Sequence, residues 1–440
     1  MFTRKDLTKL LGPLIVEQIL TVLVGMVDVL MVAAVGEAAV SGVSLVDSIS
    51  ILIIQIFSAL ATGGAVISAQ YLGKKQSENA CRAAGQLVGV TLALSLSVTA
   101  VALLGNRALL QTIFGKVEPA VMNNALIYFE ITALSYPFIA VYNSCAALFR
   151  SMGNSKVSMA TSIVMNMINV VGNAICIYGL HMGVEGVAYP TLLSRVVAAV
   201  LMIYLIQSPS NEVRVHRIKD LRPNAHMIKN ILSIGIPNGL ESGMFQFGKI
   251  ALQSLVSSLG TAAIASYAVA SNLVTLLYLP GNAIGLGLIT IVGQCVGAGE
   301  SGQAKRYTKQ LVLINYGILL VICTAMIVFS GPLTGLYHLS PEASAISRQM
   351  IMAHSIAMVI WPLSFTVPYA LRASFDAKFT MFVSVFSMWI FRIAFAYLFV
   401  KVFKLGVMGV WYGMFIDWAF RAVLFTLRFR GIEKRATSVS

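Results

Sequence analysis

The sequence predicts an all-α integral membrane protein, with twelve transmembrane helices in two six-helix lobes related by a pseudo-twofold axis along the membrane normal. Three observations support this prediction: the composition, a series of long apolar runs and an internal repeat. Of the 440 residues, 58% are hydrophobic and 11% are charged, and the mean hydropathy is +0.84. A soluble domain has about a quarter of its residues charged. The chain is therefore expected to cross a membrane many times.

Twelve apolar runs predict the helices, and each is long enough to cross a hydrocarbon core of about 30 Å at about 1.5 Å per residue. The first six lie at residues 10–35, 46–72, 84–105, 121–148, 157–179 and 184–206, and the second six at 228–258, 263–296, 308–330, 344–370, 379–403 and 406–428. The most polar stretch of the chain separates the two sets. We therefore expect an N-terminal lobe over 1–207, a cytoplasmic linker over 208–229 and a C-terminal lobe over 230–440.

The charges are distributed as in a multi-pass protein of the inner (plasma) membrane. The net charge is +14, and with the N-terminus in the cytoplasm 22 of the 31 Lys and Arg residues fall in inner loops and termini, against four in outer loops. This satisfies the positive-inside rule and predicts that both termini are cytoplasmic. The excess of basic residues therefore reflects membrane topology and contact with anionic lipid, and it does not indicate nucleic-acid binding. No short apolar stretch with a cleavage site precedes the first helix, so we expect no removable signal peptide.

The two halves of the sequence repeat. The segment from Pro13 to Arg82 aligns without a gap with the segment from Pro237 to Arg306, and the match continues later in nearly the same register. The matched pairs include Pro13 and Pro237, Glu17 and Glu241, Gly36 and Gly260, Arg82 and Arg306, and Arg150 and Arg372. Because each half holds an even number of helices, both halves begin on the same side of the membrane and the repeat is parallel. Two such lobes around a central cavity are typical of alternating-access transporters.

The sequence carries none of the motifs of a soluble enzyme. Gly-rich phosphate loops, HExxH and GxSxG are absent from it, so we expect neither an enzyme nor direct use of ATP. The five cysteines are odd in number and widely separated, and they predict neither a disulfide framework nor a metal site. We expect no cofactor and no structural metal, and energy from an ion gradient.

The first helix carries acid inside an apolar span. Residues 13–36 contain two carboxylates, Glu17 and Asp28, eleven residues apart. This spacing is close to three helical turns, so the two share a face and lie about 16 Å apart along the axis. Glu17 is expected near an interface, where a structural hydrogen bond is the simpler interpretation. A carboxylate nearer mid-depth costs several kcal/mol unless it is paired, hydrated or protonated, so Asp28 is a candidate functional residue.

Polar residues on two further helices of the first half are candidates to complete a site with Asp28. They are Asn166, Asn169 and Asn173 on the fifth helix and Thr191, Ser194 and Arg195 on the sixth. Asn169 and Asn173 are i, i+4 and share a face. Carboxylate and amide oxygens can hold a proton or a small hard cation, and Na⁺ at Asp28, Asn169 and Asn173 is one interpretation. The alternative is a hydrogen-bond cluster that only packs the lobe.

The second half has different polar residues. The repeat places Leu252 at the position of Asp28, so a mid-membrane carboxylate belongs to one lobe only. Asp417 and Arg421 are i, i+4 on the last helix and are expected to neutralise each other. Lys249 and Arg392 are expected either to pair with Asp417 or Glu241 or to act on substrate or in coupling.

Six segments are characteristic in combination: PLIVEQILTVLVGMVDVLMVAAVGEAAVSGVS, SAQYLGKKQSENA, LFRSMGNSK, NVVGNAICIYG, IGIPNGLESGMFQFG and VGQCVGAGESGQAKR. Together they resemble the multidrug and toxic compound extrusion (MATE) family over essentially the full chain. The resemblance implies twelve helices in two lobes and antiport of organic cations against H⁺ or Na⁺. It also implies that Asp28 is the ion-coupling acid and that positions matching Asn169, Asn173 and Thr191 complete its site.

Two positions depart from the pattern of this family. Many members carry Asp where this chain has Asn173, which leaves the coupling ion open. Some members use a Glu in the middle of helix 7 and an Asp on helix 10. The first of these positions falls near Phe245 and Gln246, which makes Gln246 a polar candidate, and helix 10 has no acid in its core. We therefore expect no ion site in the second lobe.

The primary hypothesis is a secondary antiporter that exports amphipathic cationic compounds in exchange for H⁺ or Na⁺, coupled through Asp28. The expected partners are small organic cations and membrane lipid, and we expect a monomer. The nearest alternative is a flippase for lipid-linked precursors, of the related exporter superfamily, whose cationic cavity for pyrophosphate would include Lys249 and Arg392. The two-lobe repeat disfavours a passive channel.

Overall fold

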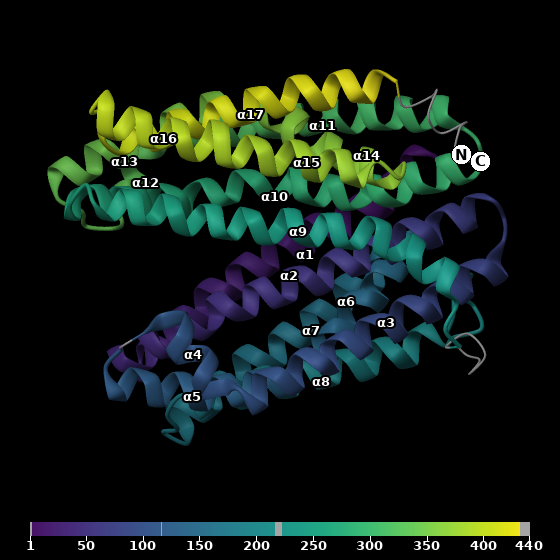
Figure 1. The fold of residues 1–440 in the computed structure, drawn as a ribbon, viewed down its shortest axis with the longest axis horizontal. Coiled ribbons are helices and arrows are strands. Elements are labelled where there is room, and N and C mark those ends of the chain that lie inside the picture. Colours follow the sequence, from purple (N-terminus) through teal and green to yellow (C-terminus); the bar gives the residue numbers. More distant parts are fainter. Residues whose placement is uncertain (1, 116, 216–221, 432–440) are drawn as a thin grey trace. The chain divides into compact units, whose positions relative to one another are not determined.

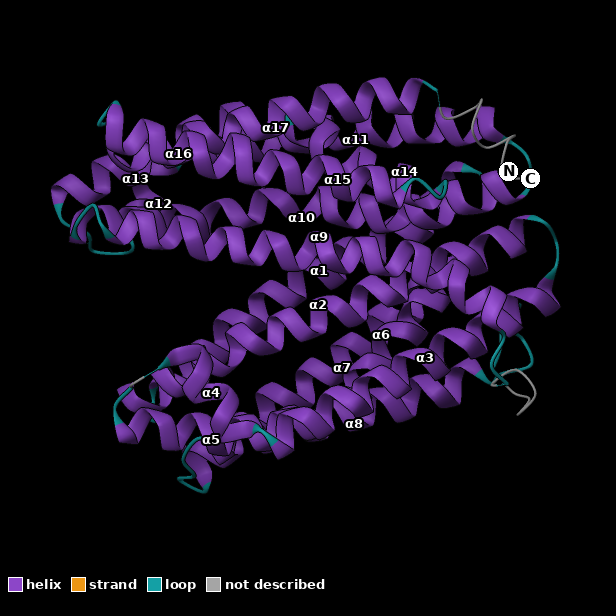
Figure 2. Ribbon diagram, viewed as in Figure 1, coloured by secondary structure: helices purple, strands orange, loops and turns teal. Residues whose placement is uncertain are grey.

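The computed structural model describes residues 2–115, 117–215 and 222–431. All regular elements in these ranges are helices, joined by short loops (Figure 2). The chain divides into two compact units, Phe2–Gly239 and Leu240–Ser440. We call them the N-terminal unit and the C-terminal unit. The prediction of an all-α membrane fold is confirmed.

The N-terminal unit contains the first eight α-helices (Figure 1). They are α1 (Arg4–Ala33), α2 (Glu37–Gly73), α3 (Ser77–Leu104), α4 (Asn106–Phe114), α5 (Pro119–Leu134), α6 (Tyr136–Ser151), α7 (Ser155–Ala174) and α8 (Glu185–Ile206). A π-helical segment, η1 (Ile175–Gly179), extends α7. Helix α2 packs against α3, α5 and α6, and α7 packs against α1 and α8. Polar side chains of α7 are therefore within reach of both α1 and α8.

The C-terminal unit begins inside α9 (Ala225–Ser257). Its α-helices are α10 (Thr261–Gly297), α11 (Ser301–Val328), α12 (Ser330–Gly335), α13 (Pro341–Ala357), α14 (Val367–Ala373), α15 (Ala377–Ser387), α16 (Phe395–Tyr397) and α17 (Gly406–Arg430). Three π-helical segments are η3 (Pro362–Thr366), η4 (Met388–Ala394) and η5 (Leu398–Val402). Helix α10 packs against α11, α13 and α14, and α17 packs along η4 and α16.

Against the twelve spans expected, the described residues contain nine to eleven candidates, and two of these are broken. Within the described residues, nine helices are long and apolar enough to cross a membrane, and two bent pairs add one span each. Helix α9, with 33 residues, is long enough to cross a membrane but is not among these apolar candidates. The runs 121–148 and 344–370 were each expected as one helix, but α5 and α6 meet at 46°, and α13 and the helix that follows it at 67°. Pro137 and Pro362 lie at the start of the second member of each pair, where a missing N–H interrupts the hydrogen-bond ladder.

The loop geometry repeats as the sequence does. Gly36 and Gly260 both have positive φ, 131° and 96°, just before the second helix of each half. Four later turns of each half also place a residue with positive φ at matching positions. The pairs are Lys75 and Gly299, Gly115 and His338, Gly153 and Phe375, and His181 and Lys404. Non-glycine residues enter this region at a steric cost. Its recurrence at matching turns shows that the two halves share one chain path.

The boundary between the units lies within α9, after the expected linker 208–229. The first part of α9 belongs to the N-terminal unit because it packs closely on α2. A Cβ at Gly63 would lie 2.5 Å from the carbonyl oxygen of Ile231, and one at Gly235 would lie 2.8 Å from a Leu60 methyl group. Small residues permit this approach of two helix backbones.

Helix α2 begins at Glu37, whereas the apolar run predicted a start at residue 46. The segment 37–45 contains few polar residues, so the helix extends through it. As a consequence Asp47 lies almost three turns inside α2 and not at its end.

Candidate functional site

A cavity of about 250 Å³ lies within the N-terminal unit. Its walls come from α1, α2, α5, α7 and α8. The polar lining residues are Asp28, Ser44, Asp47, Tyr128, Asn166, Asn169, Thr191, Ser194 and Arg195. The remaining lining is mostly valine, so a small number of polar groups converge in an apolar chamber, as is typical of binding sites.

Asp28 is held by the asparagine pair of α7. Asn173 Nδ2 donates to Asp28 Oδ1 at 3.0 Å, and Asn169 lies between Asp28 and Thr191. Asn173 is completely buried and Asn169 is 7% exposed, while Asp28 is half-buried at the cavity. The structure therefore brings together the four residues expected to form the coupling site.

The amide of Asn169 satisfies both of its ends when Nδ2 faces Asp28, and rotation by half a turn would exchange its donor and acceptor. In the first orientation, Nδ2 donates to Asp28 Oδ1 and Oδ2 at 2.8 and 3.2 Å and Oδ1 accepts from Thr191 Oγ1 at 3.0 Å. This orientation suits an ionised Asp28, which only accepts. In the other, Nδ2 donates to Thr191 Oγ1 at 3.0 Å and Oδ1 faces the carboxyl group. That orientation suits a protonated Asp28, which can donate.

One oxygen of this cluster has no protein donor. Asn173 Oδ1 is buried, and it accepts no hydrogen bond from any residue that the structure describes. Buried carbonyl oxygens of this kind are normally satisfied. An unpaired oxygen beside a carboxylate suits a proton donor or a small cation.

A second acid in the cavity was not anticipated. Asp47 of α2 accepts a hydrogen bond from the Tyr128 hydroxyl of α5 at 3.2 Å, and both side chains line the cavity. The apolar run that predicted helix 2 placed Asp47 at a helix end, where an acid is unremarkable. A repeat-based extension of the helix back to the turn glycine Gly36 would have placed it inside the span.

Arg195 of α8 supplies the positive charge of the cavity. Its Nη1 donates to Ser135 Oγ at 2.6 Å, at the break between α5 and α6. The side chain is half-buried and lines the same cavity as Asp28 and Asp47. Asn166 and Ser194 also line it, as their helices predicted, but neither contacts Asp28 through a hydrogen bond among the described residues.

Glu17 lies outside this cavity and is structurally engaged. Its carboxylate is 3.6 Å from Arg150 Nη1 and accepts a hydrogen bond from Ser158 Oγ at 2.9 Å. Glu17 is 7% exposed. The interpretation of Glu17 as a structural acid agrees with these contacts.

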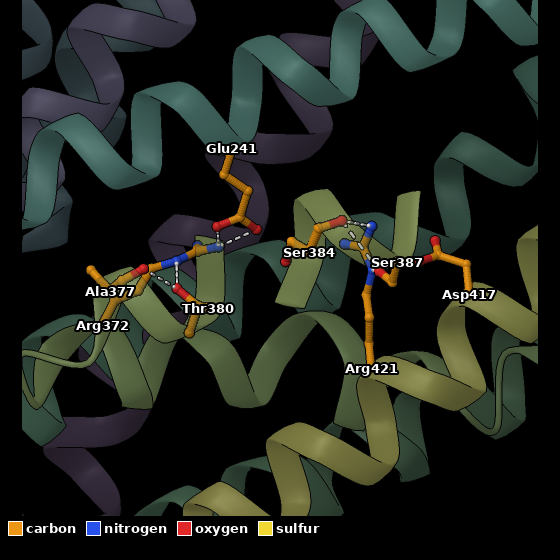
Figure 3. A network of polar contacts seen from close by, with 8 residues as sticks. All are labelled: Glu241, Arg372, Ala377, Thr380, Ser384, Ser387, Asp417 and Arg421. Carbon is orange, nitrogen blue, oxygen red and sulfur yellow. Dashed lines mark hydrogen bonds and ion pairs between the residues drawn. The ribbon is translucent and has the colours of Figure 1, made fainter. Parts of the chain in front are cut away.

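Glu241 has the equivalent contacts in the C-terminal unit. Both of its carboxylate oxygens accept from Arg372 Nη2 at 2.8 Å, and Arg372 Nε donates to Thr380 Oγ1 at 3.4 Å (Figure 3). Glu241 therefore pairs with neither Lys249 nor Arg392, one of the options that the sequence left open. Gln246 is half-buried and forms no hydrogen bond with the described residues.

A cationic cluster lies further along the same unit. Asp417 Oδ1 accepts from Arg421 Nε at 2.7 Å, and Asp417 Oδ2 lies 3.7 Å from Arg392 Nη1. Arg421 also donates to Ser387 and to the carbonyl of Ser384 (Figure 3). The expected pairing of Asp417 with Arg421, and of Arg392 with Asp417, is thus present. Arg392 is on η4, and π-helical segments often mark functional positions.

Lys249 completes this cluster without a carboxylate partner among the described residues. Its Nζ lies 5.4 Å from the centre of the Phe245 ring, and the guanidinium groups of Arg392 and Arg421 lie 5.1 and 5.8 Å from the same ring. Three cations thus surround one aromatic ring, with Asp417 as the neighbouring acid. Cation–π attraction lowers the cost of such a grouping.

A repeated helical fold that spans a membrane and holds ionisable groups within its spans is the architecture of a membrane transporter. The comparison with known families agrees with this class. The sequence model of the MatE family matches the chain twice, over residues 13–175 and 237–398. The chain belongs to the MatE family, and it is a transporter and not an enzyme. The two matches begin at Pro13 and Pro237, which the internal repeat pairs with each other.

Curated relatives match over nearly the whole chain. The uncharacterized transporter YisQ of Bacillus subtilis is 28% identical over 433 residues, which cover 97% of this chain and 94% of that protein. A Thermotoga maritima protein named probable multidrug resistance protein NorM is 26% identical, over 98% of this chain and 94% of its own length.

Solved structures of transporters share the fold. An outward-facing multidrug resistance MATE family transporter of the MOP superfamily superposes with a TM-score of 0.92 at 21% identity, over 98% of this chain and 96% of that one. A MOP superfamily transporter from Pyrococcus furiosus, whose structure is described as having a binding pocket of reverse polarity that suggests a different function, superposes with a TM-score of 0.91 at 21% identity, over 98% and 96%. This likeness concerns the fold.

Proposed function

We propose that the protein is a secondary antiporter that exports amphipathic organic cations in exchange for H⁺ or Na⁺, and that Asp28 carries the coupling. The observation that supports this most directly is the position of Asp28, which lines a cavity inside the membrane and is bonded to Asn173 of α7. The names of two relatives as multidrug resistance proteins support the substrate class. The basic inner loops support a plasma-membrane protein with both termini in the cytoplasm. We also propose that it works as a monomer.

Coupling requires that ion binding changes the contacts of Asp28. When Asp28 is ionised, Asn169 Nδ2 donates to it and Thr191 donates to Asn169. When Asp28 is protonated, its hydroxyl donates to Asn169 Oδ1 and the amide donates to Thr191 instead. Thr191 can then donate to the carbonyl oxygen of Val187 at 2.9 Å. Protonation on α1 thereby changes a hydrogen bond on α8, in the turn that contains the helix-bending Pro190.

Sodium is the alternative coupling ion, as a transported species. Asp28 and the unpaired Oδ1 of Asn173 are oxygen donors of the kind that bind hard cations. The neutral Asn173, at a position where the family resemblance implies Asp in many members, removes one charge from such a site. We therefore leave both ions in the proposal and distinguish them by experiment.

The experiment uses purified protein in sealed vesicles that contain a fluorescent organic cation. A pH gradient or a Na⁺ gradient is imposed separately, and the initial rate of dye movement is measured. We expect one gradient to drive transport in the wild type and Asp28→Asn to abolish it. Glu130→Gln, an exposed acid of α5 outside the cavity, is the matched control and should transport normally. Undiminished gradient-driven transport by Asp28→Asn would exclude the assignment.

A second candidate function is the flipping of an anionic lipid-linked precursor. It is supported by the three cations around Phe245, which have one neighbouring acid, Asp417. A pyrophosphate group would suit such a cluster. Binding of a lipid diphosphate to the purified protein, lost in Lys249→Ala and retained in Asp28→Asn, would favour this function. Dye antiport that is unchanged in Lys249→Ala would favour the first.

A further inference from the structure

The cavity of the N-terminal unit contains more charge than one coupling acid requires. Its charged lining residues are Asp28 of α1, Asp47 of α2 and Arg195 of α8, and Tyr128 of α5 is its further titratable lining residue. Four helices thus each contribute one of these groups. With both acids ionised the cavity has one uncompensated negative charge.

Uncompensated charge is costly where water is scarce. Moving an isolated ion from water into a low-dielectric interior costs several kcal/mol even after relaxation, whereas an opposite charge nearby offsets much of this. Partial burial of Asp28, Asp47 and Arg195 therefore favours a cavity with no net charge. Arg195 offsets one carboxylate, and one monovalent cation offsets the other.

Two observations indicate that this cation is shared between the acids. Both carboxylates line one cavity. Neither has a salt bridge to an arginine or lysine within 4 Å among the described residues, so Arg195 is not paired with either of them in particular. The Arg195 guanidinium is instead anchored to Ser135. Asn173 Oδ1 is fully buried beside Asp28 and accepts no hydrogen bond within the described part of the chain, so it is an oxygen donor available to a ligand with positive charge.

We propose that Asp47 is a second coupling residue, and that Arg195 compensates one of the two carboxylates so that Asp28 and Asp47 together bind a single exchangeable monovalent cation. This inference rests on the proposed antiport. It differs from that proposal because it makes Asp47 necessary as long as Arg195 is present, and because it attributes this necessity to the net charge of the cavity.

The test is a charge-compensation series in the vesicle assay described above. Asp47→Asn leaves Asp28 and Arg195 as a neutral pair with no need of a cation, so gradient-driven transport should fall by at least about 10-fold. The double variant Asp47→Asn with Arg195→Gln restores one net negative charge, and its rate should recover to within about 3-fold of the wild type. Asp47→Glu keeps the charge and should also stay within about 3-fold.

Two controls separate charge from contact and from folding. Tyr128→Phe removes the hydrogen bond to Asp47 at constant charge, and should cost less than Asp47→Asn. All variants are compared with the wild type for elution volume and melting temperature in detergent. Because the double variant and Asp47→Glu provide independent readouts, a poorly folded single variant does not remove the test.

The outcomes distinguish this inference from the function on which it rests. If neither gradient drives transport in the wild type, the antiport proposal fails. If the wild type is active, Asp28→Asn is inactive and Asp47→Asn is fully active, antiport stands and the shared-cation inference is wrong. A folded double variant that remains as inactive as Asp47→Asn would also overturn it.

Discussion

Arg372 donates through Nη2 to both carboxylate oxygens of Glu241 at 2.8 Å, across 131 residues of sequence. The first half contains the same pairing, since Glu17 lies 3.6 Å from Arg150. The repeat matches Glu17 with Glu241 and Arg150 with Arg372. A hydroxyl completes each group, Ser158 in one and Thr380 in the other. What recurs in the two halves is therefore a partly buried ion pair that joins the first helix of the half to its fourth span.

Removal of one partner of this pair should be strongly destabilising. Arg372→Met leaves the partly buried carboxylate of Glu241 without its counter-charge, and such losses cost at most about 3–5 kcal/mol, the range for a fully buried charge. The double variant Glu241→Gln with Arg372→Met should be less destabilised than Arg372→Met alone. Melting temperatures of purified protein in detergent measure this. A double variant that melts below the single variant would contradict the role of the ion pair.

Asp417 should be even less replaceable, because it is completely buried between two arginines. Asp417→Asn leaves Arg421 and Arg392 without a carboxylate and should cost about 3–5 kcal/mol. Asp376→Asn, at the better-exposed pair with Arg428, is the comparison and should lower the melting temperature less. Equal effects of the two substitutions would show that burial does not set the energy of these pairs.

The contact of α7 with α8 depends on a glycine next to the candidate site. A Cβ at Gly172 would lie 2.7 Å from Cβ of Pro190. The Pro190 ring cannot move aside unless its helix moves with it. Gly172→Ala should therefore cost about 1–3 kcal/mol by overpacking and should also reduce transport, because it displaces Asn169 from Thr191. Gly89→Ala on α3, where an added Cβ meets nothing within 4 Å, is the matched control and should be neutral or slightly stabilising.

Asn173 should support coupling through its hydrogen bond to Asp28. Asn173→Leu removes a donor to a carboxylate, an interaction worth about 1.5–3 kcal/mol, so the gradient-driven rate should fall about 10-fold or more. Asn166→Leu, at a residue that lines the same cavity without bonding Asp28, should have a smaller effect. Vesicle transport at a fixed gradient gives both rates. Equal losses would indicate that cavity polarity, and not the bond to Asp28, is what matters.

A glutamine of α3 attaches the segment before α9 to the N-terminal unit. Gln86 Nε2 donates to the carbonyl of Arg222 at 2.7 Å, and the Asn224 N–H donates to Gln86 Oε1 at 2.8 Å. Gln86→Leu should remove both bonds and accelerate limited proteolysis of the segment 222–224 by proteinase K, a protease of broad specificity, while transport changes little. The cleavage rate is read from gels of the native protein. An unchanged rate would show that other contacts hold the segment.

Much of the fold followed from the sequence because its causes are local. Apolar runs longer than the hydrocarbon core must be helices that satisfy their own backbone, and a gapless repeat that pairs Pro13 with Pro237 requires a repeated chain path. The spacing of Asn169 and Asn173 placed them on one face of a helix, and the depth of Asp28 marked it as costly. These statements need only the helical period and the thickness of a membrane.

The tertiary structure decided which helix faces which, since helical period does not specify the partner of a face. It brought Asp47, Tyr128 and Arg195 to the cavity of Asp28 from three other helices. Asp47 was not predicted because hydropathy places the start of α2 at its apolar residues, whereas the helix begins at Glu37, directly after the turn glycine Gly36. Packing likewise assigned Glu241 to Arg372 and left Lys249 beside Phe245. Sequence thus determined the spans, their repeat and the acid of α1, and packing alone determined that this acid shares its cavity with a second one.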